Sequence, residues 1–192
     1  FDEHAADWDS RPARAHAARL RRVVSEAGIL PGWHVCDVGT GTGVLVPLLA
    51  RAVGPSGRVV AIDYSAEMVR QALKKRFPPW VLVRVADIHR TEFPDSSFDA
   101  VVCNACFPHL ARKTRALAEM RRILKPAGVL IISHPTGRAW VNAHHRSVAG
   151  PVCRDAVPTA LRLAQTLRRC GFEPDSLIDE EAFYLVRARK TA

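Results

Sequence analysis

Three glycines at every second position constrain the fold of this chain more than any other feature. The apolar run 33–38 has the character of a buried strand, and Gly39, Gly41 and Gly43 follow it at once. Apolar residues then recur at helical spacing through residues 44–53. A strand, a glycine turn and a helix in this order open a nucleotide-binding βαβ unit, because a backbone without Cβ atoms can turn sharply and approach a ligand closely.

An acidic residue, Asp37, stands two positions before the first of these glycines. The spacing G-x-G-x-G differs from the dinucleotide fingerprint G-x-G-x-x-G, whose turn directs amide groups at a pyrophosphate. A carboxylate repels a pyrophosphate and attracts an ammonium or sulfonium group, so Asp37 favours a cationic ligand. The alternative interpretation is an ordinary glycine turn between a strand and a helix.

The rest of the chain alternates apolar, strand-like runs with helical patterns. This alternation is typical of an α/β fold, in which helices cover both faces of a parallel sheet. Strands are expected at residues 33–38, 58–63, 80–85, 100–104, 129–134, 172–178 and 182–188. Helices are expected at residues 11–28, 44–53, 114–124 and 159–170, and from residue 66 onward. The short link 179–181 requires the last two strands to be antiparallel, and 192 residues fit one domain, 1–192.

The composition is that of a soluble globular protein, with 48% hydrophobic and 24% charged residues and no apolar run of membrane-spanning length. Five cysteines, mostly within apolar runs, indicate a reducing compartment, so a cytoplasmic protein is expected. We expect it to be a monomer or a homodimer. The chain begins at Phe1 without a methionine, which leaves targeting open. The net charge of +9 brings nucleic acid into consideration as a partner, although the basic residues are spread along the chain without interleaved aromatics.

Two further acids stand at the ends of expected strands. Asp63 lies 20 residues after Gly43, and a carboxylate at the tip of the second parallel strand can accept both hydroxyls of a ribose. A simple helix-capping or surface role is the alternative for Asp63, and Ser65 is the candidate N-cap of the next helix. Asp87 ends the third strand and, from the sequence alone, is an acid in a loop.

The run D-x-G-x-G-x-G from Asp37 to Gly43 resembles the first motif of class I S-adenosylmethionine-dependent methyltransferases. Asp63, Asp87 and the turn 124–128 follow in the order of that family. The resemblance covers the whole chain and is nearest to the small-molecule methyltransferases called type 11, which are similar to quinone-biosynthesis methyltransferases. It implies a Rossmann-like, mostly parallel sheet of seven strands in the order 3-2-1-4-5-7-6 with an antiparallel last strand. It also implies S-adenosylmethionine as the cofactor and S-adenosylhomocysteine as its product.

The resemblance assigns roles along the carboxyl ends of the first strands. Asp37 would lie near the methionine part of the cofactor, Asp87 would accept a hydrogen bond from the adenine amino group, and Ile88 would cover the ring. The predicted cofactor-binding residues are Asp37, Gly39, Thr40, Gly41, Gly43, Asp63, Tyr64, Met68, Asp87, Ile88 and Asn104.

Residues that contact the methyl acceptor are expected after strands four and five, since ligands bind beyond the carboxyl ends of parallel strands. The segment 135–157 has no clear period and is predicted to be an acceptor-binding loop, while residues 1–30 are predicted to form an N-terminal helix or lid. The predicted substrate-binding residues are Phe107, His109, Arg138, Asn142 and His145.

His134 is the candidate catalytic residue, as a base or as a group that orients the acceptor, because imidazole titrates near neutral pH. The alternative is a polar histidine that caps a strand end. Arg138 could hold a carboxylate or phosphate of the acceptor or make a surface salt bridge, and His109 could be structural.

A metal site is the competing interpretation of the histidines. His134 with His144 or His145 could share an ion, but neighbouring residues in a strand point opposite ways and no His-x-x-x-His spacing occurs. Cys103-x-x-Cys106 lacks a second pair, so no metal is predicted; a soft metalloid acceptor held by these thiols and Cys153 stays open.

The chemistry expected is in-line transfer of a methyl group from a sulfonium to a small-molecule acceptor. Residues 104–107 lack the proline pair and aromatic residue typical of amino-directed methyltransferases, which disfavours a nucleobase or glutamine acceptor. An RNA methyltransferase that uses the basic surface and a non-catalytic protein that binds S-adenosylmethionine are the alternatives.

Overall fold

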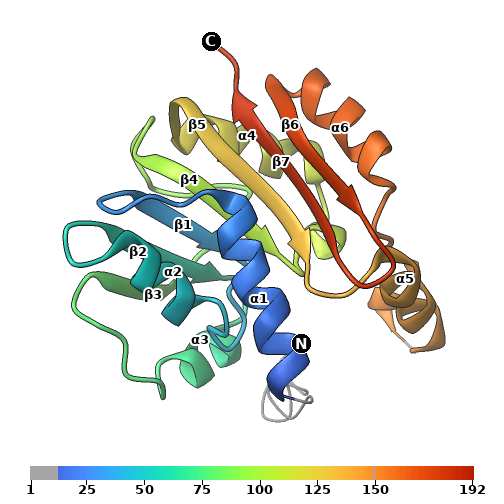
Figure 1. Cartoon of the computed structure of the whole chain (residues 1–192), viewed down its shortest axis with the longest axis horizontal. Helices are drawn as coiled ribbons and strands as arrows, with labels where there is room; N and C mark the ends of the chain where they lie inside the picture. Colours follow the sequence, from blue (N-terminus) through green and yellow to red (C-terminus); the bar gives the residue numbers. More distant parts are fainter. Residues whose placement is uncertain (1–12, 149) are drawn as a thin grey trace.

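The computed structural model describes residues 13–148 and 150–192. Its centre is a seven-stranded sheet in the order β3-β2-β1-β4-β5-β7-β6 (Figure 1). The strands are β1 (His34–Val38), β2 (Arg58–Asp63), β3 (Val81–Val85), β4 (Phe98–Asn104), β5 (Leu124–His134), β6 (Phe172–Asp179) and β7 (Tyr184–Lys190). β1 to β5 pair in parallel, and β7 lies antiparallel between β5 and β6. The predicted strand order and the antiparallel closing strand are confirmed.

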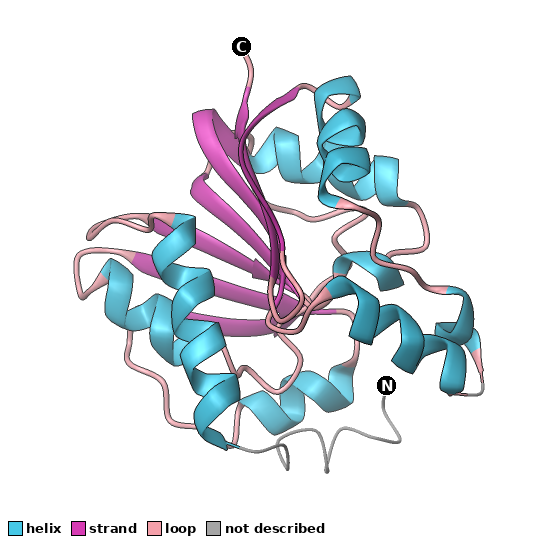
Figure 2. Cartoon of the chain, turned by 45° about the vertical axis from the view of Figure 1, so that its right-hand side comes forward, coloured by secondary structure: helices cyan, strands magenta, loops and turns pink. Residues whose placement is uncertain are grey.

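Helices cover both faces of this sheet (Figure 2). They are α1 (Ala13–Ala27), α2 (Val46–Val53), α3 (Ala66–Ala72), α4 (Lys113–Ile123), α5 (Arg138–Ser147) and α6 (Ala160–Arg169), with short 3-10 helices η2 (Phe107–His109) and η3 (Pro151–Arg154). One apolar cluster joins α1, α2 and α3 to one face, and a second joins α4 and α6 to the other. None of the helices in the described part of the chain combines the length and apolar character that crossing a membrane requires.

The burial of the strands explains their sequence patterns. Val35 packs in the cluster of α1 to α3 and the next residue, Cys36, in the cluster of α4 and α6. Because both faces of β1 are covered, this strand is continuously apolar rather than alternating. In the outer strand β6 the side chains of alternate residues are exposed instead, so this edge presents one face to solvent.

Local sequence signals predicted the positions of most of the helices correctly. In α4, Leu117, Met120 and Ile123 recur at a spacing of three and are fully buried. Ser65 caps α3 as predicted, since its side-chain oxygen accepts a hydrogen bond of 3.0 Å from the backbone N–H of Met68. Most expected boundaries agree with the structure to within two residues.

Two expectations about local structure were wrong. The segment 135–157 was expected to be an irregular loop, but it contains α5 and η3. Only Val141 and His145 of α5 are buried, and a histidine in an otherwise narrow apolar stripe hides the helical period. The second error concerns β5, which was expected to begin at Val129 but begins at Leu124. Leu124 pairs with Phe98 across a bulge, a contact between distant residues that no local pattern encodes.

The predicted N-terminal helix or lid covers residues 1–30, and its part up to residue 12 lies outside the described residues. Within the described residues, α1 continues the predicted helix and packs Leu20 and Val23 against the sheet.

Candidate active site

The glycine turn lies at the carboxyl end of β1, where it continues the pairing with β2. The N–H groups of Gly39 and Thr40 both donate to the carbonyl oxygen of Ile62, at 2.9 and 3.0 Å. Gly39 and Gly41 have φ angles of 68° and 57°, in the left-handed region that disfavours side chains. A Cβ on Gly41 would meet no atom of the described residues within 4 Å, so these residues leave space beside the middle of the turn that a ligand can enter.

Gly39 faces the opposite way, into the protein. A Cβ at this position would overlap the side chain of Cys106, which follows β4. The turn after β1 and the exit of β4 are therefore in direct contact at this point. This contact joins the predicted cofactor side of the site to the predicted acceptor side.

Asp37 is buried, with 2% of its surface exposed, and accepts a hydrogen bond of 2.7 Å from the Thr40 hydroxyl. Burial raises the pKa of Asp37 to about 7, the Thr40 hydrogen bond opposes this rise, and the nearby charge of Asp63 adds to it. The carboxyl group is therefore close to half ionised at neutral pH. A cation bound beside it would favour the ionised form.

Asp63 links the glycine turn to the start of α3. One carboxylate oxygen accepts the N–H of Gly41 at 2.8 Å and the other accepts the N–H of Ser65 at 2.9 Å. A carboxylate is an acceptor of several hydrogen bonds, and the contacts of Asp63 with ribose hydroxyls stay a prediction.

The remaining predicted cofactor residues lie around this edge in different environments. Asp87 accepts a hydrogen bond of 2.9 Å from the backbone N–H of His89 and contacts its ring Nδ1 at 2.6 Å. Ile88 and Met68 are buried, whereas Tyr64 is 79% exposed. Their contacts with a cofactor stay predictions.

His134, at the end of β5, is 4% exposed, and its Nε2 has no hydrogen-bond partner among the described residues. Burial, with the nearby His109 and His145, lowers the pKa of His134 to about 3. The ring is therefore neutral at physiological pH and too weak a base to compete for a proton. This environment weighs against His134 as the base, and its orienting role stays a prediction.

Two other predicted residues meet at a residue that the sequence analysis missed. His109 Nδ1 lies 2.7 Å from a carboxylate oxygen of Asp155, and His145 Nδ1 lies 2.7 Å from the Asp155 backbone carbonyl oxygen. The centres of the two imidazole rings are 5.0 Å apart. Asp155 follows η3, 46 residues after His109, and no motif or period in the sequence marks it.

The other predicted acceptor-side residues make internal contacts. Arg138 pairs with Asp179 at 3.1 Å, and the Asn142 amide bonds both backbone groups of Val157 at 2.8 and 3.0 Å. The side-chain oxygen of Asn104 accepts a hydrogen bond of 3.0 Å from Ser133, and Phe107 is buried. Arg138 and Asn142 thus hold α5 in place, and their binding roles stay predictions.

The cysteines form no disulfide bonds. All five are free, and a hydrogen bond with Cys106 together with burial raises the pKa of Cys103. Among residues 13–148 and 150–192, no three histidine, cysteine or acidic side chains are arranged to hold a metal ion.

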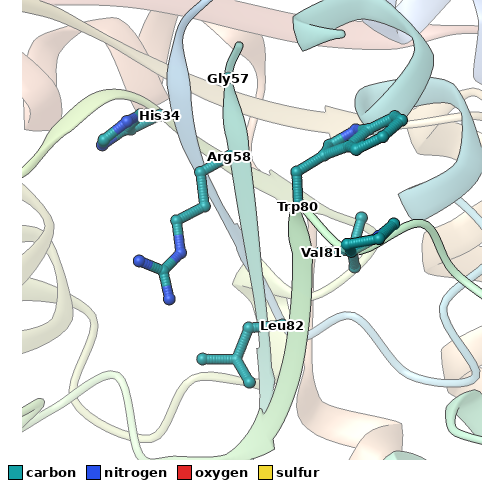
Figure 3. A pocket seen from close by; sticks show the side chains of 7 residues that line it. His34, Gly57, Arg58, Trp80, Val81 and Leu82 are labelled. Carbon is teal, nitrogen blue, oxygen red and sulfur yellow. The ribbon is translucent and has the colours of Figure 1, made fainter. Parts of the chain in front are cut away.

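A separate hollow lies at the opposite ends of the strands, away from the glycine turn (Figure 3). It is lined at the amino ends of β1, β2 and β3, by His34, Arg58 and Leu82 among others. Ligands of parallel sheets bind beyond the carboxyl ends, where the glycine turn, Asp37 and Asp63 lie, so we assign no role to this hollow.

The family match agrees with this geometry. A family model described as "Methyltransferase domain" matches residues 36–132, which begin within β1, end within β5 and make up 97 of the 192 residues. The chain belongs to the class I S-adenosylmethionine-dependent methyltransferases. The predicted fold, family and cofactor are confirmed at this level.

Relatives of this methyltransferase are similar over part of their length. It is 35% identical over 111 residues to the ubiquinone/menaquinone biosynthesis C-methyltransferase UbiE of Ralstonia pickettii, with 57% of this chain and 46% of the relative covered. It is 42% identical over 106 residues to a 37.1 kDa protein in transposon TN4556 of Streptomyces fradiae, covering 55% and 31%. The methyltransferase thus spans about half the length, or less, of these curated relatives.

Solved structures match over nearly the whole chain. A SAM-dependent methyltransferase from Aquifex aeolicus superposes with a TM-score of 0.81 at 25% identity, covering 98% of each chain. A methyltransferase of Haloferax volcanii, solved with the activator Trm112, has a TM-score of 0.81 at 21% identity and shows a shared fold.

Proposed function

We propose that this methyltransferase transfers a methyl group from S-adenosylmethionine to a small-molecule acceptor by in-line displacement. The observation that carries the proposal is the meeting of Gly39 and Cys106, which brings the predicted cofactor turn beside the segment that leads to His109. Relatives named as quinone-biosynthesis C-methyltransferases favour a hydroquinone-like acceptor.

The residues present fit this cofactor. The open space at Gly41 would let a nucleoside approach the backbone, and the buried Asp37 suits a positively charged group. Asp63 and Asp87 would hold the ribose and the adenine. When bound, S-adenosylmethionine supplies a methyl group that is already activated by the sulfonium charge.

The protein's contribution is then mainly positional. Asp37, Asp63 and the glycine turn would fix the donor, while the segments after β4 and β5 would hold the acceptor in line with it. Holding two reactants in this way can lower the barrier by about 7–11 kcal/mol.

Replacing Asp63 should weaken cofactor binding. We expect Asp63→Ala to lower the affinity for S-adenosylmethionine by about 1–3 kcal/mol, because the ribose hydroxyls and the N–H groups of Gly41 and Ser65 lose their acceptor. Titration calorimetry measures the change. Glu67→Gln is the control that should leave the affinity unchanged, because the Glu67 carboxylate bonds to Arg70 and Gln71 of the same helix. An equal dissociation constant for Asp63→Ala and the wild type would contradict the ribose assignment.

The proposed function is tested in two steps. Calorimetry with S-adenosylmethionine and S-adenosylhomocysteine tests the cofactor site, and no heat with either would refute it. Mass spectrometry with a labelled methyl donor and a pool of small metabolites then identifies the acceptor, and binding without any labelled product would favour the non-catalytic alternative.

The net charge of +9 keeps RNA as a second candidate acceptor. Labelled transfer to RNA, together with RNA binding that weakens steeply as salt rises, would support it. Weak binding that is insensitive to salt would exclude this alternative.

A further inference from the structure

We propose that His109 is the general base of this enzyme, that Asp155 positions it, and that the acceptor carries a weakly acidic hydroxyl of the phenol or hydroquinone class. This inference rests on the proposed function. It differs from the sequence-based prediction, which gave the role of base to His134.

The backbone links His109 to the predicted cofactor turn. His109 closes a single 3-10 turn, η2, in which its N–H donates to the carbonyl oxygen of Cys106 at 2.9 Å. Cys106 is the residue whose side chain packs against Gly39 of the cofactor turn. Lys113 holds η2 in place, because its Nζ donates to the carbonyl oxygens of Pro108 and Leu110 at 2.8 and 3.0 Å. The turn that carries His109 therefore begins at the residue that contacts the predicted cofactor turn.

The contact with Asp155 sets the chemistry of the imidazole. A carboxylate 2.7 Å from Nδ1 accepts the Nδ1 proton, so the lone pair of the neutral ring is on Nε2. Asp155 is itself held in place, since His145 binds its carbonyl oxygen and Asn142 binds the backbone of Val157, two residues further on. A carboxylate that orients an imidazole and stabilises its protonated form is the arrangement that general-base catalysis requires.

Accessibility and charge separate His109 from His134. His109 is half-buried, whereas His134 is buried. Among the described residues, the charged or titratable groups near His109 include Asp155, His145, Lys113 and His134. Burial lowers the pKa of His109 and the Asp155 carboxylate opposes this shift, so the ring is neutral at physiological pH but has a partner ready to stabilise a proton.

This pair suits a hydroxyl with a pKa near that of tyrosine, about 10, because an imidazole can remove such a proton with help from the adjacent carboxylate. The acceptor O–H proton passes to His109 Nε2. The oxygen, or a ring carbon conjugated with it, bonds to the methyl carbon, and the electron pair of the broken carbon–sulfur bond goes to sulfur. On the carbon route the ring proton then leaves to solvent, and the proton held by His109 returns to the acceptor oxygen.

The test uses catechol and 1,4-dihydroxynaphthalene as acceptor probes and measures S-adenosylhomocysteine release. We expect His109→Gln to lower kcat by about 10²–10⁴-fold and to leave the dissociation constant of S-adenosylmethionine unchanged. His34→Gln, at the opposite edge of the sheet, is the matched control and should retain wild-type kcat. The activity of His109→Gln should recover as pH approaches the pKa of the probe, since the hydroxyl then ionises without a base.

The Asp155→Asn variant tests whether Asp155 positions His109. Without the carboxylate the pKa of His109 should fall, so the acid limb of the kcat/KM profile moves to lower pH while kcat drops. Nitrogen-15 NMR of the imidazoles tests the pair without any acceptor: wild type should show the proton on Nδ1 of His109, and Asp155→Asn should lose that preference.

The outcomes separate the inference from the proposed function. An Nε2–H tautomer in the wild type, or full activity of His109→Gln at neutral pH, would overturn the role of His109. Intact cofactor binding with no methylation of either probe would overturn the acceptor class alone. Loss of all cofactor binding in the wild type would instead refute the proposed function.

Discussion

S-adenosylmethionine should bind this protein roughly 50-fold more weakly at pH 5 than at pH 7, because the ionised fraction of Asp37 falls from about one half to about one hundredth. The pKa of about 7 follows chiefly from burial of the carboxyl group. Only the ionised form attracts a cation, so the affinity should fall about fivefold from pH 7 to pH 6 and about tenfold from pH 6 to pH 5. Calorimetry across pH 5 to 8, in two buffers of different ionisation enthalpy, measures both the affinity and the proton released.

The stability of the ligand-free protein should change with pH in the opposite direction to the cofactor affinity. The folded-state pKa of Asp37 lies above the unfolded value of about 3.9, so its contribution to stability is present at low pH and is lost as pH rises from about 4 to 7. Cofactor binding should therefore stabilise the fold most near and above neutral pH.

Asp37→Asn is the control for both effects, since it keeps the shape of the side chain and removes its charge. This variant should bind more weakly at pH 7 and lose the pH dependence. Comparing S-adenosylhomocysteine, which lacks the sulfonium charge, shows whether Asp37 responds to the sulfonium or to the ammonium group. A wild-type affinity that stays flat between pH 5 and 7 would contradict the role of Asp37.

Replacing Gly39 by alanine should destabilise the protein by about 2–5 kcal/mol and abolish cofactor binding. The left-handed φ of 68° costs an alanine about 1–2 kcal/mol, and overlap of its Cβ with Cys106 adds about 1–3 kcal/mol. Urea unfolding gives the first quantity, and calorimetry gives the second.

Gly41→Ala provides the matched comparison. It has a similar φ of 57°, but its Cβ would enter open space, so its folding cost should be only the backbone part, about 1–2 kcal/mol. Because that space is where the ligand is expected, Gly41→Ala should still weaken S-adenosylmethionine binding. Equal losses of stability in the two variants would show that the contact with Cys106 has no energetic role.

The sequence predicted what local patterns and the family resemblance encode. The glycine turn after β1, the cap at Ser65 and the order of the seven strands are confirmed, because apolar periodicity, N-cap chemistry and motif spacing act over short distances. The position of Asp63 at the end of β2 follows from the same reasoning.

What the sequence could not predict depends on contacts between distant residues. Asp155 meets His109 only because the residue after η3 lies against η2, and no spacing rule links residues 46 positions apart. Likewise, the sequence alone does not distinguish His134 from His109, since both are histidines near the ends of predicted strands. Their difference in exposure, and hence in basicity, follows from packing alone.

The family match ends at residue 132, and α5 and η3 come after it. The proposed base therefore belongs to the part that the family model describes, whereas its carboxylate partner belongs to the segment 135–157, which Asn142 and Arg138 hold in place. None of the predicted cofactor-binding residues lies in this segment, so a change within it leaves the nucleoside-binding half intact. Grafting residues 135–157 between related enzymes should accordingly transplant acceptor preference while leaving the donor the same.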